Sequence, residues 1–186
     1  MAITIIVEDG TGKADANSYA SAADSDAYHA AHLYGDAWTN ATADRKAAAL
    51  AMATRTVNAA FVWNGYRKGH EQALEWPRNM APREGIAAGF IFAGSGQLTG
   101  AFWDETKIPP PLKMAVCEMA RQLLIADRTA DPDTAGIASL GLGNGAIAVT
   151  FNAADRIGVL PEEVLRLLGG LGRRRGRSTM RKVTRG

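Results

Sequence analysis

Cysteine, aromatic side chains and long apolar runs are all scarce in this sequence of 186 residues. Its single cysteine, Cys117, excludes an internal disulfide and a zinc site built from cysteines. No window approaches the roughly 18 to 20 consecutive apolar residues that span a bilayer, and the first residues lack the basic region of a signal peptide. We therefore expect a soluble protein, made in the cytoplasm, without a membrane partner.

Catalytic and cofactor-binding motifs are missing as well. The chain has no Walker A loop, no Gly-x-Ser-x-Gly turn and no His-Glu-x-x-His helix, and the glycines of 94–100 have the wrong spacing for a dinucleotide loop. His29 and His32 stand three apart near several aspartates, but no third ligand converges on them, so we expect exposed histidines on a polar face. The sequence predicts no enzyme activity, no catalytic residue, no cofactor and no metal.

What the sequence does contain is a helical pattern rich in alanine. Hydrophobic residues make up 47% of the chain and aromatics only 7%, which favours close helix packing over a β-sandwich. Apolar residues recur at spacings of three and four, with Thr42 as a capping residue and Pro109 to Pro111 opening a central helix. We expect a mainly α fold: a bundle of about four helices over 21–34, 43–61, 110–126 and 161–168.

Four further segments complete the expected organisation. Ile3 to Val7 reads as a short strand or arm, 79–107 as a long projecting loop, and 137–151 as a small β-hairpin turning at Asn144-Gly145. A helical domain over 1–172 would then precede an extended C-terminal arm over 173–186. The apolar residues of the loop predict an interface with a neighbouring subunit or another protein, formed by Phe90, Ile91, Phe92, Phe102 and Trp103.

The arm carries the sharpest charge feature. It holds seven of the 21 Lys and Arg residues and no acid, so the other 172 residues have 14 basic against 19 acidic groups. Such a division points to a partner, either nucleic-acid phosphates or an acidic groove on a protein. The arm lacks the aromatic residues that stack on single-stranded bases, which favours a protein groove or a duplex backbone. The residues predicted to contact this partner are Arg173, Arg174, Arg175, Arg177, Arg181, Lys182 and Arg185.

Several motifs in the body resemble a family of tailed-phage proteins encoded among head and tail genes. The agreement runs in order over roughly residues 6–128, and its most specific piece is the segment 72–78. The matching motifs are Val7-Glu8-Asp9-Gly10-Thr11-Gly12, Asp15-Ala16-Asn17-Ser18-Tyr19, Trp63-Asn64-Gly65, Gln72-Ala73-Leu74-Glu75-Trp76-Pro77-Arg78 and Ile108-Pro109. Such proteins are often labelled DnaT-like single-stranded-DNA-binding proteins, and they also look like head–tail connector proteins.

The connector resemblance implies a structural head-to-tail adaptor of a bacteriophage virion. Its subunits would form a ring, commonly of twelve copies, under the portal protein and above a tail-side neck or stopper protein, with genomic DNA passing through the lumen. The alternative is a single-stranded-DNA-binding protein of the replication type. That alternative draws on the basic arm and on the exposed-looking aromatics Trp63, Tyr66 and Trp76.

Overall fold

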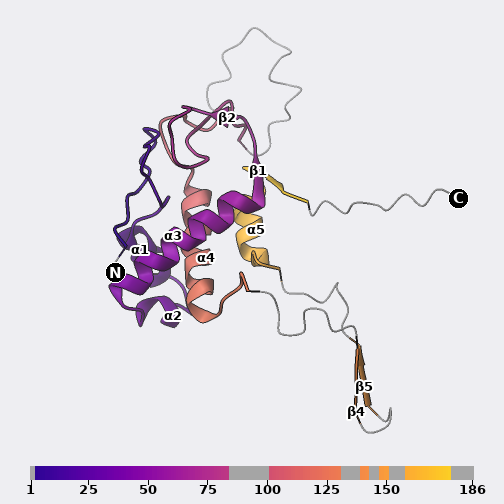
Figure 1. The fold of residues 1–186 in the computed structure, drawn as a ribbon. Helices are drawn as coiled ribbons and strands as arrows, with labels where there is room; N and C mark the ends of the chain where they lie inside the picture. The colour runs from indigo at the N-terminus through magenta and orange to yellow at the C-terminus, as the bar shows by residue number, and fades with distance from the viewer. Residues whose placement is uncertain (1–2, 84–100, 131–138, 143–146, 151–157, 177–186) are drawn as a thin grey trace, which may run out of the picture.

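A computed structural model describes residues 3–83, 101–130, 139–142, 147–150 and 158–176, and it is helix-rich with a few short strands (Figure 1). Its helices are α1 (Ala22–Ala30), α2 (Asp36–Thr39), α3 (Ala43–Ala60), α4 (Pro110–Ile125) and α5 (Glu162–Leu168). The predicted bundle of about four helices is not confirmed. The described residues form five helices of very unequal length together with short antiparallel strands, so only the helix-rich class is confirmed.

Helix α4 is the centre of this arrangement, because each of the other four helices contacts it. Its residues Leu112, Val116 and Met119 are fully buried, as the spacing of three and four predicts. Helix α3 crosses over α4 in Figure 1 and buries Leu50, Thr54 and Val57. No helix among the described residues has the length and hydropathy needed to cross a bilayer.

The first predicted helix is shorter than expected. A capping box between Ser21 and Asp24 starts α1, but the helix ends at Ala30 rather than near Tyr34. The chain then turns into α2, whose Trp38 is 1% exposed and donates its indole N–H to Asp26 at 2.7 Å. If α1 continued to Tyr34, the rigid helix would move Trp38 away from Asp26. We infer that α1 ends early because the buried indole and its hydrogen bond favour the turn into α2.

The N-terminal segment takes the second of its two predicted forms, an extended arm, and pairs through an isolated bridge between Val7 and Ser18. It is held by the buried Glu8 carboxylate, which accepts the backbone N–H groups of Gly10, Gly12 and Lys13 at 2.8 to 2.9 Å. Gly10 has φ +104°, and a Cβ there would lie 1.9 Å from a backbone oxygen. The glycine therefore lets this turn pack directly against the segment before α4.

Three two-stranded antiparallel sheets complete the described fold. β4 (Ser139–Leu142) pairs with β5 (Ile147–Thr150) as the predicted hairpin, which Figure 1 draws away from the helices; its Asn-Gly turn lies outside the described residues. The other two sheets were not predicted: β2 (Tyr66–Arg67) pairs with β3 (Arg78–Asn79), and β1 (Phe61–Trp63) pairs with β6 (Gly172–Arg174).

Both described ends of the expected projecting loop lie on the body of the protein. Pro82 and Phe102 form an antiparallel bridge, and Trp103 donates its backbone N–H to Ala81 at 2.9 Å. Phe102 and Trp103 are half-buried, and the Arg83 guanidinium lies 4.8 Å from the centre of the Trp103 ring. The other predicted interface residues, Phe90, Ile91 and Phe92, lie outside the described residues, so this interface stays a prediction.

Candidate nucleic-acid interface

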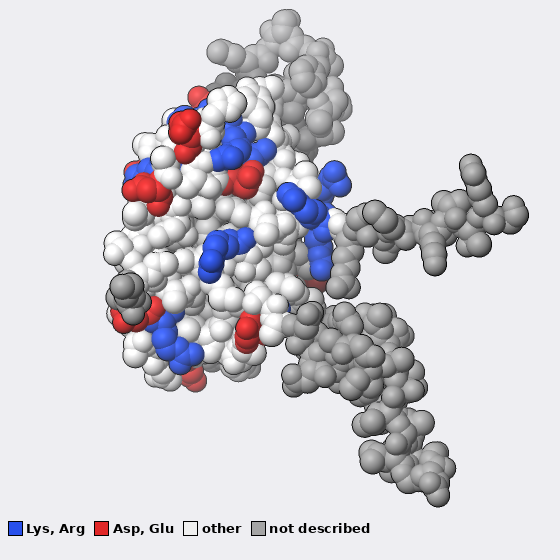
Figure 2. Space-filling model, viewed as in Figure 1, with Lys and Arg blue, Asp and Glu red and all other residues white. Residues whose placement is uncertain are grey.

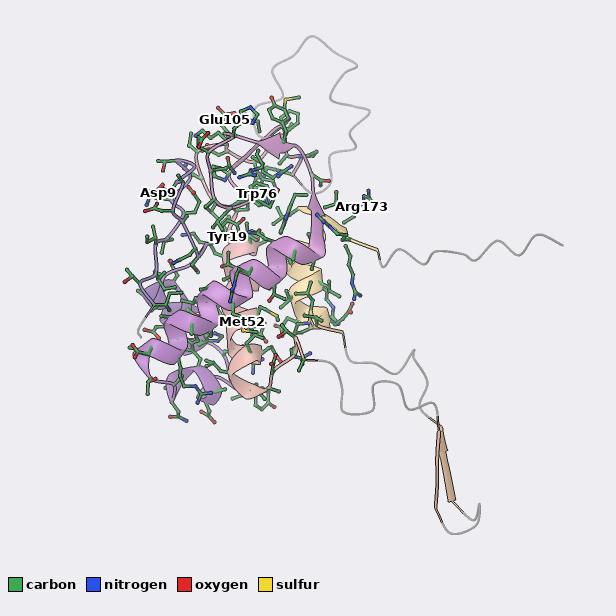
Figure 3. All side chains as sticks on the ribbon, in the orientation of Figure 1. Asp9, Tyr19, Met52, Trp76, Glu105 and Arg173 are labelled. Carbon is green, nitrogen blue, oxygen red and sulfur yellow. The ribbon has the colours of Figure 1, made fainter. Side chains whose placement is uncertain are left out.

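The segment with the most specific sequence motif, residues 72–78, is a structural element rather than an exposed contact. Gln72 is 2% exposed; its side-chain amide donates to the carbonyls of Leu74 and Pro77 and accepts the N–H of Gly69. Trp76 is fully buried beside Tyr19 (Figure 3), and its backbone N–H donates to the Tyr19 hydroxyl at 3.0 Å. The tyrosine hydroxyl in turn donates to Asn58 of α3, which ties this segment to the helical core.

Arg78 ends the segment and is also turned inward, with 8% of its surface exposed. Its guanidinium donates to the backbone carbonyls of Asn64, Gly65 and Glu75 and to the Glu75 carboxylate, at 2.7 to 3.1 Å. These bonds join the turn between β1 and β2 to the start of β3. The Arg78 guanidinium is therefore hydrogen-bonded within the fold and is not available to a DNA phosphate.

Of the three aromatic side chains predicted to be exposed, two are buried in the structure and one is exposed. Trp63 is 6% exposed and Trp76 is 0% exposed, and their rings meet edge to face at 6.2 Å. Tyr66, by contrast, is 58% exposed. The prediction that all three offer stacking surfaces is thus wrong for both tryptophans, because each ring has its faces in the core.

The basic arm begins inside a sheet. Arg173 and Arg174 lie in β6, opposite Val62 and Phe61 of β1, and Arg175 continues the ladder by donating its N–H to Ala60 at 2.7 Å. Gly172 allows the close approach, since a Cβ there would lie 2.6 Å from the Val62 oxygen. The first three arginines of the arm therefore have fixed backbone positions. The remaining predicted contacts, Arg177, Arg181, Lys182 and Arg185, lie outside the described residues.

This pairing builds a groove of about 620 Å³ between α3, the segment before α5 and the end of β6. Its lining combines apolar side chains with three arginines. We call it the basic groove, and its residues are Met52, Arg55, Thr56, Ala59, Ala60, Val159, Leu160, Arg174, Arg175 and Gly176. The α3 residues share one helix face because Met52, Arg55, Thr56 and Ala59 are spaced three and four apart.

The charge of the groove is uncompensated within the described part of the chain. Arg55 and the three arginines Arg173 to Arg175 are exposed, and no described carboxylate lies within 4.0 Å of any of them. Figure 2 shows blue side chains on the face over α3 and at the edge where β6 leaves the body. Figure 3 places Met52 in the middle of this face and Arg173 at that edge. The arrangement can attract and hold a polyanion.

The predicted arm residues and the groove overlap only in part. Sequence reasoning identified Arg174 and Arg175 but missed Arg55 and the apolar floor, because Arg55 is 119 positions away in the chain from Arg174. The exposed face of α3 was a usable signal: an arginine flanked by Ala59 and Met52 on the face opposite the buried stripe.

A separate cluster of ionisable side chains lies around α4, with Glu118 buried, His32 half-buried and Glu163 exposed. Potential ligand atoms of His32, Glu118 and Glu163 lie within 4.8 Å of one another, but the Glu118 carboxylate already accepts hydrogen bonds from Arg121 and Gln122. Burial raises the pKa of Glu118, and these hydrogen bonds outweigh it and hold the pKa below its usual value. Glu118 and Arg121 thus form a buried ion pair, and both oxygens of the Glu118 carboxylate already accept hydrogen bonds.

The expectation of exposed histidines is wrong for His29. It is 4% exposed, with Nε2 3.2 Å from the Cys117 carbonyl, and burial lowers its pKa. His29 faces α4 because α1 packs directly on that helix. The Cys117 thiol is buried as well, which raises its pKa to about 11.

In a comparison with protein families, the sequence model described as "Putative DnaT-like ssDNA binding protein" matches residues 3–186. No curated protein and no solved structure matches the chain. The prediction of a head-to-tail adaptor is overturned by this match, which agrees with the alternative made from the sequence. The match gives no support to portal or tail-side partners, or to a place in a virion neck.

Proposed function

The chain belongs to the family of DnaT-like ssDNA binding proteins, and from this premise we propose that it binds single-stranded DNA at the basic groove. The observation that carries the proposal is the group of four exposed arginines, Arg55 and Arg173 to Arg175, without a described acidic partner. A strand of DNA presents a row of phosphates, and guanidinium groups bind phosphate oxygens with short, charge-assisted hydrogen bonds.

The position of these arginines suits a flexible polyanion. Arg174, the last residue of β6, and Arg175, which follows it, line the groove together with Arg55 of α3, whereas Arg173 is outside the lining. A DNA strand in the groove would therefore meet the guanidinium groups of Arg174, Arg175 and Arg55, and Arg173 would add positive charge beside it. Binding of this kind displaces counterions from the DNA, so its strength depends steeply on salt.

Salt titration of oligonucleotide binding tests the proposal. The full chain is titrated into a fluorescein-labelled oligothymidylate at a series of salt concentrations, and the slope of log affinity against log salt is measured. Each phosphate contact on single-stranded DNA contributes about 0.7 to this slope, so the double variant Arg174→Gln/Arg175→Gln is expected to reduce it by about 1.4.

The matched control also removes two exposed positive charges, but away from the groove: Arg45→Gln/Lys107→Gln. We expect the control to keep the slope of the unaltered chain. Equal losses in both double variants would mean that net charge alone acts, and absence of oligonucleotide binding by the full chain at low salt would reject the proposed function.

A further inference from the structure

The floor of the basic groove is apolar, which phosphate binding alone does not require. Ala59 and Ala60 at the end of α3 line the groove together with Met52 and with Val159 and Leu160 from the segment before α5. Val159 is 41% exposed even though it is apolar. The groove volume of about 620 Å³ lies within the range of about 300–1,000 Å³ typical of small-ligand pockets.

The apolar floor and the arginines at the rim together indicate which kind of ligand the groove can bind. It should carry a flat or compact apolar group together with negative charges on either side. A nucleotide within a single strand has this form, because its base is not held in a duplex stack and its two neighbouring phosphates are charged. In a duplex the base faces are covered and the rigid backbone keeps them from the floor.

We propose that the basic groove takes up an unstacked base of the single strand, which lies on Ala59 and Val159 while Arg55, Arg174 and Arg175 bind the flanking phosphates. This inference rests on the proposed function and adds to it the part of the DNA that the groove recognises. It also predicts selectivity toward single strands, although the buried Trp63 and Trp76 cannot stack on bases.

The small side chains of α3 give the floor its depth. Ala59 and Ala60 occupy the last turn of the helix, where longer side chains would fill the space beneath Arg174 and Arg175. Thr56 uses its hydroxyl within the helix, donating to the Met52 carbonyl at 2.8 Å. The floor therefore offers contact surface and no hydrogen-bond pattern that would select one base, so binding should be tolerant of sequence.

Oligonucleotides with and without bases test this inference directly. The full chain is titrated with oligothymidylate and with an oligonucleotide of the same length whose central residues are abasic, so that the phosphates are unchanged. We expect oligothymidylate to bind at least about fivefold more tightly, which corresponds to roughly 1 kcal/mol of base contact. A groove variant, Ala59→Ser/Val159→Ser, should bring this ratio close to one while leaving the salt slope unchanged.

Leu33→Ser is the matched control, because Leu33 is an apolar side chain that is 85% exposed and lies outside the groove lining. It should keep the preference for bases. Equal binding of the two oligonucleotides, with an arginine-dependent salt slope, would overturn the base site and leave the proposed function standing. A preference that survives in the groove variant would equally overturn it, and the absence of binding by both oligonucleotides would reject the proposed function itself.

Discussion

Replacement of Arg78 by alanine separates a structural role of the 72–78 segment from a role in DNA contact. The guanidinium bonds three backbone carbonyls and the Glu75 carboxylate, and the residue is 8% exposed. Water can reach the carbonyls of the exposed Asn64 and Gly65 once the side chain is gone, so each lost bond should cost about 1 kcal/mol rather than the full desolvation penalty. The three carbonyls together predict a loss of about 3 kcal/mol in the free energy of unfolding.

Urea unfolding followed by tryptophan fluorescence measures this loss, since Trp38, Trp63 and Trp76 are buried and report on the core. With a slope of about 2 kcal/mol per molar urea, the midpoint should fall by about 1.5 M. Arg78→Lys keeps one charged donor and should lose less. At a temperature where the variant stays folded, its affinity for oligothymidylate should be unchanged. An unchanged urea midpoint together with weakened DNA binding would refute the structural role.

Four further outcomes follow from buried groups. Arg121→Ala leaves the Glu118 carboxylate buried without its cation, and about 3–5 kcal/mol of unfolding free energy should be lost, as urea unfolding can measure; a loss below 1 kcal/mol would show that water replaces the guanidinium. Glu8→Gln removes the charge that accepts three backbone N–H groups and should lower the melting temperature, whereas an unchanged melting temperature would count against the N-terminal turn. Burial lowers the pKa of His29, so the unfolded chain takes up the proton first and stability should fall as pH drops below about 6.5; a His29→Asn variant should flatten this part of the pH profile, and an equally steep profile would exclude His29 as the cause. The Cys117 thiol, with its pKa raised to about 11, should react with a disulfide reagent only after unfolding, and rapid reaction in native buffer would contradict its burial.

The long helices could be predicted from the sequence because their signals are local. The spacing of Leu50, Thr54 and Val57 defined the buried face of α3, and the capping residue Thr42 and the prolines before α4 marked helix starts. The β4–β5 hairpin was also found from its local turn residues. In each case the residues that decide the structure lie within a few turns or one hairpin of one another.

The candidate site depended on contacts that no local pattern contains. Pairing of Val62 with Arg173 joins residues 111 positions apart, and neither segment carries a strand pattern strong enough to reveal it. Burial of Trp63 and Trp76 was missed for a related reason, since an aromatic cluster in a loop has the same composition whether it packs inward or stacks on bases. The basic composition of the arm was readable, but its division into a strand and a further segment was not.

The β1–β6 pairing also changes how the arginines can act. As part of a free arm, Arg173 to Arg175 would lose backbone entropy when DNA binds, which offsets part of the phosphate attraction. In the structure, folding has already fixed these residues: Leu171 is buried, its carbonyl accepts the N–H of Asn64, and Arg175 bonds to Ala60. The backbone entropy of these residues is therefore lost when the protein folds and does not weaken DNA binding. A fixed backbone at Arg174 and Arg175 leaves only their side chains to be ordered when DNA enters the groove, which favours binding over that of the same residues in an unpaired arm.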